Sequence, residues 1–179
     1  MPQHVNAAPS QWVRRFVSLI RPGGRVLDLA AGGGRHTRLL LGAGFAVVAV
    51  DRDGAALAPF AAEPRCDIAV LDLEDGAPWR LGADFDGIVV TNYLHRPLLP
   101  ILAEALAPGG ILIYETFLAG NERFGKPSNP AFLLRENELL DAYRGRLTIV
   151  AFEQGIVATP HPAAIQRIAA VKGPVAALP

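Results

Sequence analysis

Two acidic residues and a glycine turn are the parts of this sequence best suited to hold a ligand. Asp28 lies within an apolar stretch, where a lone carboxylate is costly unless something pairs with it. Gly32 to Gly34 follow, and a glycine turn before a helix exposes the backbone and the free N–H groups of the helix start to a ligand. A second apolar stretch ends in Asp51, where nucleotide-binding sheets place a carboxylate against ribose hydroxyls. This spacing predicts a cradle for a cofactor.

Stretches typical of strands and helices alternate along the chain and must position these residues. Strands are expected at residues 25–30, 46–50, 68–71, 85–91 and 111–115, and helices at 11–20, 35–43 and 97–106. Apolar strands that alternate with helices are typical of a parallel sheet covered on both faces. Two later strands, 147–157 and 164–171, have a link too short for a helical crossover, which indicates an antiparallel hairpin. The predicted fold class is α/β: a Rossmann-like, doubly wound, mostly parallel sheet of seven strands with a C-terminal antiparallel hairpin.

Three local features complete the predicted fold. Ser10 is expected to cap the first helix, and Asp53 a short helix after the second strand. Residues 107–110, Ala-Pro-Gly-Gly, are expected to form a turn. A polar loop over 121–137 should lead into a short helix at 138–143.

Length, charge and cysteine content limit the class of protein. The 179 residues are expected to form one domain, with an N-terminal helix within 1–24 and a substrate-side loop and helix within 120–146. The 17 basic and 17 acidic residues balance and give no strong nucleic-acid signal. A single cysteine and no signal-peptide or membrane-spanning pattern favour a cytoplasmic protein without a membrane partner. The histidines and the cysteine lack metal-ligand spacing, so no metal is expected, and the oligomeric state is open.

The glycine turn also matches a family motif. The pattern acid-x-Gly-x-Gly-x-Gly fits Asp28, Ala30, Gly32 and Gly34, with alanine where the first glycine is usual. Together with the parallel sheet and the terminal hairpin, it makes residues 25–172 resemble a class I S-adenosylmethionine-dependent methyltransferase. The resemblance implies that S-adenosylmethionine is the cofactor and S-adenosylhomocysteine the product. The methyl group of Ala30 should narrow the cofactor space slightly and be tolerated.

The same resemblance implies roles for residues at the strand ends. Gly32 and Gly34 would let the methionine part approach the backbone, while Asp28 would anchor the turn or receive the cofactor's ammonium group. Asp51 would accept both ribose hydroxyls, with Arg52 near the adenine. The adenine site resembles the stretch after the third strand, where Asp72 would accept from the exocyclic amine and Leu73 would supply apolar contact. His36 is expected either to bind the cofactor carboxylate or to cap the helix.

Four stretches narrow the resemblance within that family. They are 32–37 (Gly-Gly-Gly-Arg-His-Thr), 92–97 (Asn-Tyr-Leu-His-Arg-Pro), 115–117 (Glu-Thr-Phe) and 120–130, which continues into 132–134 and 138–140. They are similar to small bacterial methyltransferases of the tellurite-resistance type. That name does not identify a substrate.

Candidate catalytic residues follow the fourth and fifth strands. Asn92 is expected beside the methyl donor, and Tyr93 beside the substrate, at the sheet edge where open α/β folds bind ligands. His95 is a candidate general base by its location, although isolated histidines are mostly structural. Glu115 is expected to orient substrate or to pair with Arg123.

The loop at 120–130 is the best candidate for contacting the acceptor, because long loops in compact domains are commonly functional. Arg123 and Lys126 would add positive charge there, which suits an anionic acceptor. A rigid surface connection is the alternative interpretation. A small-molecule acceptor is favoured over RNA or protein by the neutral charge and the lack of an added recognition domain.

Two further alternatives remain. Gly32-x-Gly34-x-x-Thr37 approximates the dinucleotide fingerprint, but the third glycine is missing and a nicotinamide enzyme leaves Asp28 unexplained. A cofactor-binding protein without catalysis is the other, and the residues Asn92, His95 and Glu115 argue against it.

Overall fold

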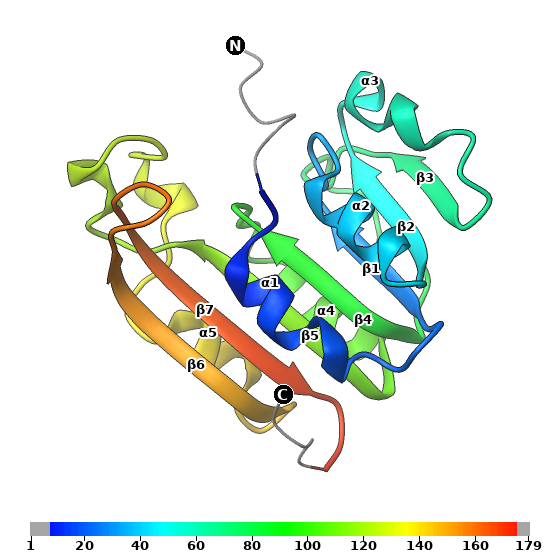
Figure 1. Ribbon diagram of the computed structural model, residues 1–179. Coiled ribbons are helices and arrows are strands. Elements are labelled where there is room, and N and C mark those ends of the chain that lie inside the picture. The colour runs from blue at the N-terminus through cyan, green and yellow to red at the C-terminus, as the bar shows by residue number, and fades with distance from the viewer. Residues whose placement is uncertain (1–7, 175–179) are drawn as a thin grey trace.

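A seven-stranded sheet organises the structure, a computed structural model that describes residues 8–174. Its strand order is β3-β2-β1-β4-β5-β7-β6 (Figure 1). The strands are β1 (Arg25–Leu29), β2 (Ala46–Asp51), β3 (Cys66–Val70), β4 (Phe85–Thr91), β5 (Leu106–Phe117), β6 (Thr148–Val157) and β7 (Ala163–Val171). The first five strands are parallel, whereas β7 is antiparallel to β5 and β6. The predicted fold class is confirmed.

Helices cover both faces of this sheet. They are α1 (Gln11–Phe16), α2 (Arg35–Gly42), α3 (Gly54–Leu57), α4 (Leu98–Ala105) and α5 (Glu138–Tyr143). Figure 1 shows α1 and α2 on the near face and α4 and α5 on the far face. Ser10 and Asp53 cap α1 and α3 with their side chains, as the sequence predicted. No helix of the described residues is long and apolar enough to span a membrane.

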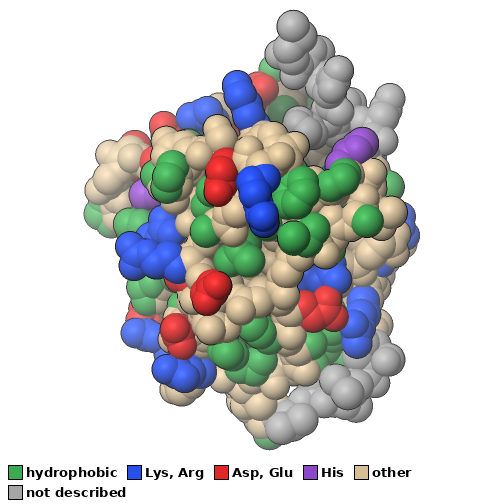
Figure 2. Space-filling view, turned by 90° about the vertical axis from the view of Figure 1, so that its left-hand side faces the viewer, with side chains coloured by type: hydrophobic (Ala, Val, Ile, Leu, Met, Phe, Trp, Pro, Cys, Tyr) green, Lys and Arg blue, Asp and Glu red, His purple; other side chains and the backbone are tan. Residues whose placement is uncertain are grey.

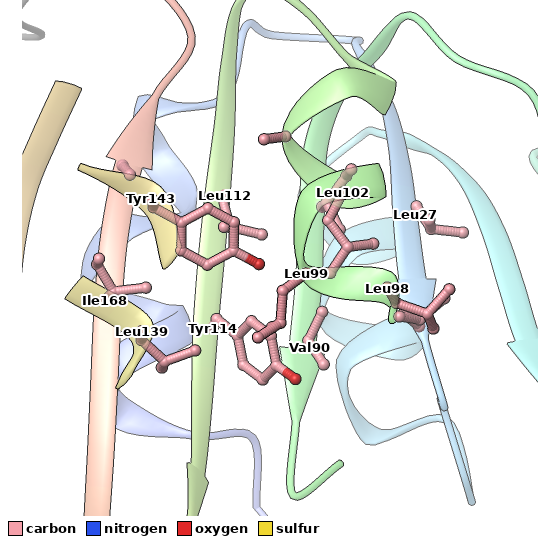
Figure 3. Close-up of a cluster of buried hydrophobic side chains, with 14 of the residues drawn as sticks. Leu27, Val90, Leu98, Leu99, Leu102, Leu112, Tyr114, Leu139, Tyr143 and Ile168 are labelled. Carbon is pink, nitrogen blue, oxygen red and sulfur yellow. The ribbon is translucent and has the colours of Figure 1, made fainter. Parts of the chain in front are cut away.

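Two hydrophobic cores fill the layers between sheet and helices. On the far face, α4 and α5 pack Leu99, Leu102 and Tyr143 against Tyr114 of β5 (Figure 3). On the near face, α1 buries Trp12 and Phe16 with the opposite side chains of the same strands. Because the strands are apolar on both sides, the sheet is held from both faces and its strand ends are fixed relative to one another.

The main differences from the predicted boundaries are in β5, α1 and β3. Strand β5 begins at Leu106, so the expected turn at 107–110 is part of an irregular strand whose pairing with β4 skips from Leu106 to Ile111. Glycine at 110 permits this, because a Cβ there would lie 2.6 Å from the Phe85 carbonyl oxygen. Helix α1 ends at Phe16 and continues only as a 3-10 turn. Strand β3 begins at Cys66 and ends at Val70, so it starts two residues and ends one residue earlier than expected.

Gly34, where the glycine turn enters α2, is required by packing. Its φ is +71°, and a Cβ there would lie 2.1 Å from the buried Phe60 ring. We expect Gly34→Ala to lower the free energy of unfolding by about 2–4 kcal/mol, from left-handed backbone strain and overpacking. Gly42→Ala is the control, since a Cβ there meets nothing and should change stability by no more than about 1 kcal/mol. Urea unfolding measures both, and equal midpoints for the two variants would contradict this account.

Candidate functional site

The carboxyl ends of β1, β2, β4 and β5 meet at one edge of the sheet, the upper side in Figure 1. Strand β1 pairs with both β2 and β4, and a doubly wound sheet opens a crevice where its connections diverge in this way. A cavity of about 380 Å³, the first cavity, lies there. Seven of the residues expected at the site line it: Ala30, Asp51, Arg52, Asp72, Leu73, Asn92 and Tyr93.

Asp51 holds two loops of the first cavity in place. Its Oδ2 accepts from the Gly32 backbone N–H at 2.8 Å, and its Oδ1 accepts from the Asp53 N–H at 2.9 Å. An ionised carboxylate has about four acceptor sites, so this side chain can still accept from a ligand. The carboxylate therefore joins the glycine turn to the end of β2 and still faces the cavity.

The glycine turn leaves room for a ligand at one position. A Cβ added to Gly32 would meet nothing within 4 Å, although its φ of +53° favours glycine. Ala30 also has a left-handed backbone, with φ of 55°, and lines the first cavity. Glycine is usual at this position of the motif because it adopts that backbone without strain. Alanine in place of the usual glycine at position 30 therefore affects the backbone conformation of the turn as well as the space left for a ligand.

Asp28 lies behind the turn. Its side chain is buried, Thr37 Oγ1 donates to its Oδ2 at 2.6 Å, and it does not line the first cavity. Burial raises the pKa of Asp28 to about 6, because a charged carboxylate loses solvation, while the Thr37 hydrogen bonds oppose the rise. Of the two expected roles, the geometry supports anchoring of the turn.

His36 is a buried link between three elements. The Ser10 N–H donates to Nε2 at 3.0 Å, so Nε2 carries no proton, and Nδ1 donates to Thr91 Oγ1 at 3.2 Å. Burial and the charges of Arg35 and Arg14 lower the pKa of His36 to about 3. The neutral ring thus joins the α1 cap to the end of β4, and both nitrogens have protein partners.

Glu115 belongs to a network with the first helix. Ser10 Oγ donates to its Oε1 at 2.8 Å, and Arg167 lies 3.1 Å from its Oε2. The expected pairing with Arg123 is wrong: Arg123 donates to the Gly120 carbonyl and stacks on Phe124 instead. An arginine on β7 reaches Glu115 because β7 is inserted beside β5, with Glu115 opposite Arg167.

A second cavity of about 530 Å³ adjoins the first. Four residues line both: Asn92, Phe117, Pro127 and Phe132. Lys126, one of the two basic residues of the 120–130 loop assigned to the acceptor, lines the second cavity. His95 and Arg123 line neither cavity.

Asn92 lies at the junction of the two cavities. Its φ of 55° is left-handed, a conformation that asparagine adopts more readily than most residues, and its N–H donates to the Glu115 carbonyl at 2.9 Å. Next to it, the Tyr93 hydroxyl is buried and has no partner among the described residues. Burial, with the nearby Glu74 carboxylate, raises the pKa of Tyr93, so this hydroxyl stays protonated at neutral pH.

Four residues to which the sequence analysis gives no role shape the site: Phe117, Phe132, Arg96 and Gln166. Phe117 and Phe132 form apolar walls, and Arg96 holds the segment that carries Phe132 through the carbonyls of Ala131 and Leu133. Buried Gln166 of β7 binds the same segment at Arg135 and Leu139. Arg96 and Phe132 lie in stretches that carried the family resemblance, which was the only signal for them in the sequence.

Comparison with known proteins identifies a family and solved structures of the same fold. A family model described as "Methyltransferase domain" matches residues 1–154. The solved structure of TehB from Haemophilus influenzae is similar with a TM-score of 0.77 and 20% identity, over 94% of this chain and 64% of that chain. A 1,6-didemethyltoxoflavin-N1-methyltransferase from Burkholderia thailandensis was solved with 1,6-didemethyltoxoflavin and S-adenosylhomocysteine. It is similar with a TM-score of 0.64 and 24% identity, over 91% of this chain and 76% of that chain. At these identities the structures show the fold.

A shorter match is to a ribosomal RNA small subunit methyltransferase H from Nostoc. It is 45% identical over 56 residues, which are 30% of this chain and 18% of that protein. The chain thus spans less than a fifth of this curated relative and 64% of the TehB structure.

The family model covers most of the chain, and the chain belongs to the methyltransferase-domain family, within the class I S-adenosylmethionine-dependent methyltransferases. The cofactor of this class is S-adenosylmethionine, and its product is S-adenosylhomocysteine. The resemblance inferred from the glycine motif is confirmed.

The raised pKa of Asp28 predicts a pH effect on stability. Between about pH 4 and 6 the folded state binds more protons at Asp28 than the unfolded state, so this group lowers stability as pH rises. Asp28→Asn keeps an acceptor for Thr37 and removes the titration. We expect the free energy of unfolding of the variant, minus that of the wild type, to increase from pH 4 to pH 7 in urea titrations.

A control with the opposite sign is Asp86→Asn. Burial raises the pKa of Asp86, but its hydrogen bonds to Arg21 and Arg25 outweigh burial and hold the pKa below its ordinary value. Asp86 therefore adds stability to the wild type as pH rises through the acid range. The free energy of unfolding of Asp86→Asn, minus that of the wild type, should decrease over the same range. If the difference in free energy of unfolding between Asp28→Asn and the wild type did not change with pH, Asp28 would not be a buried carboxyl group with a raised pKa.

Proposed function

We propose that the chain transfers the methyl group of S-adenosylmethionine to a small-molecule acceptor, with the cofactor in the first cavity. One observation carries this proposal: the first cavity, lined by Asp51 and Asp72 at successive strand ends, continues into the second cavity at Asn92. A donor and an acceptor in two joined cavities can meet at their junction. S-adenosylmethionine supplies an activated methyl group on a cationic sulfur, and the protein supplies proximity and orientation.

The residues of the first cavity suit this cofactor. Asp51 accepts the ribose hydroxyls, while Asp72 and Leu73 contact the adenine. Arg52 lies at the same wall, and Gly32 gives the methionine part access to the backbone, since nothing occupies the direction of its missing Cβ. The carboxylates lining the cavity outnumber its one arginine, which favours a cationic ligand.

Asp28, His36 and Gly34 act through the turn in this proposal. Asp28 fixes the start of α2 through Thr37, and His36 ties that helix to β4 and the α1 cap. Gly34 lets α2 begin against Phe60. These residues position the turn that receives the cofactor.

At the junction, Asn92 orients the reacting groups and Tyr93 supplies an aromatic face to the cationic sulfur. His95 lies outside both cavities, and Glu115 is held by Ser10 and Arg167. We therefore assign neither of them the removal of a proton, and the acceptor must reach the site in a reactive form.

The short match to a ribosomal RNA methyltransferase makes RNA the second candidate acceptor. An RNA site needs a basic surface, because phosphate contacts supply most of the affinity. Figure 2 shows basic and acidic side chains interspersed on the face it presents, and the formal charge of the chain is zero. These observations favour a small acceptor.

Calorimetry with S-adenosylhomocysteine tests the cofactor site. Asp51→Ala should weaken binding by about 10- to 100-fold, as expected for lost hydrogen bonds to a charged group. Asp53→Asn is the matched control, because this neighbouring residue caps α3, lies outside both cavities, and asparagine also caps helices.

Circular dichroism confirms that each variant is folded before titration. Wild-type protein that is folded but does not bind millimolar S-adenosylhomocysteine would overturn the proposed function. Equal affinities of the wild type and Asp51→Ala would overturn the role of Asp51. Methylation of an RNA fragment in preference to small acceptors would favour the second candidate.

A further inference from the structure

The second cavity has the size and position of an acceptor site. Its volume of about 530 Å³ lies within the range of small-molecule sites, and it meets the first cavity at Asn92. Its lining contains two aromatic rings, one proline and one cationic side chain. The identity of these groups limits the kind of molecule that can bind there.

The aromatic walls favour a flat molecule. Phe132 is 47% exposed, and of the four exposed large hydrophobic side chains in the described part of the chain it alone lines these cavities. An accessible aromatic side chain in a concave site typically marks a ligand surface. Phe117 and Pro127 add further apolar surface, and aromatic faces pack best against other flat rings.

Arg96 fixes the position of Phe132. Its Nη1 donates to the Ala131 carbonyl at 2.8 Å and its Nη2 to the Leu133 carbonyl at 2.9 Å, so one guanidinium holds the residues on both sides of Phe132. The same group makes a two-pronged pair with Glu138, at 2.6 and 2.9 Å. The backbone that carries Phe132 is thus held in place, which lowers the entropic cost of ordering this wall when a ligand binds.

Lys126 gives the second cavity its charge. It is exposed, and it makes no hydrogen bond or ion pair with any residue between 8 and 174. The other described lining residues are uncharged: Asn92, Phe117, Pro127, Ser128, Asn129 and Phe132. A cation without an anionic partner beside aromatic walls suits a ligand that carries negative charge.

The same lining contains no general base. No carboxylate or imidazole is among the described residues of the second cavity, so an acceptor that needs deprotonation finds no group there to remove its proton. An acceptor that is already ionised avoids this requirement. Lys126 stabilises the ionised form by its charge.

We propose that the second cavity selects a flat aromatic acceptor that binds as an anion, with Phe117 and Phe132 packing on the ring, Lys126 pairing with the charge and Arg96 positioning Phe132. This inference rests on the proposed function. The ionised heteroatom of the acceptor forms the new bond to the methyl carbon, and the electron pair of the broken carbon–sulfur bond stays on sulfur. One negative and one positive charge are neutralised, and no proton has to leave.

Three unreactive probes test this selection by calorimetry on the full chain saturated with S-adenosylhomocysteine. They are 2-naphthoate, its uncharged analogue 2-naphthylmethanol, and its non-aromatic analogue decahydronaphthalene-2-carboxylate. We expect 2-naphthoate to bind at least about tenfold more tightly than either analogue, because only it satisfies both the rings and Lys126.

Variants separate the contribution of the Lys126 charge to probe binding from that of the Phe132 ring. Lys126→Met should reduce the affinity for 2-naphthoate to that for 2-naphthylmethanol, while Lys126→Arg should keep it. Phe132→Leu should weaken both naphthalene probes and leave the decahydronaphthalene acid unchanged. Arg135→Met is the control: it removes a positive charge from the same segment at an exposed side chain outside both cavities, and should change no affinity.

The outcomes distinguish the two proposals. Binding of S-adenosylhomocysteine without preference among the probes, or without loss in Lys126→Met, would overturn the aromatic-anion inference alone. Failure of S-adenosylhomocysteine to bind would overturn the proposed function and this inference with it.

Discussion

The Asp51 carboxylate is the interaction on which the site depends. Asp51 is the last residue of β2. Its carboxylate accepts from the Gly32 N–H of the turn after β1 and from the Asp53 N–H at the start of the connection that follows β2. Two neighbouring strand ends are therefore fixed at one point, which lies on the wall of the first cavity. Because a carboxylate has acceptor sites left over, the group that organises the loops is also available to a ligand.

A buried inner layer supports this wall. Asp28 and Thr37 bond beneath the turn, and His36 joins α2 to β4 and to the cap of α1. Burial acts on both titratable groups by disfavouring charge: it raises the pKa of Asp28 and lowers that of His36. Between about pH 4 and 6 this layer is thus close to neutral, whereas exposed aspartate and histidine side chains would be charged. The charged residues of the site line the first cavity.

The sequence predicted those features that depend on local spacing. Apolar strand patterns, glycine positions and acids close to a strand end depend only on near neighbours in the chain, so Asp51, Asp72 and the cap at Asp53 could be identified. The sequence could not predict contacts between residues that are far apart in the chain and meet only in the fold. Glu115 pairs with Arg167, 52 positions away, because β7 inserts beside β5. Arg96 holds Ala131 and Leu133 because the segment after β5 returns to the residues just before α4. Charge pairing alone gave the wrong partner for Glu115.

The central claim is that the joined cavities at the carboxyl edge of the sheet place a methyl donor and an acceptor on either side of Asn92. A crystal structure with S-adenosylhomocysteine tests this most directly. The account predicts ribose hydroxyls on the Asp51 carboxylate and the cofactor sulfur facing the opening toward Phe117 and Phe132. A cofactor bound away from Asp51, or with its sulfur turned from the second cavity, would contradict it.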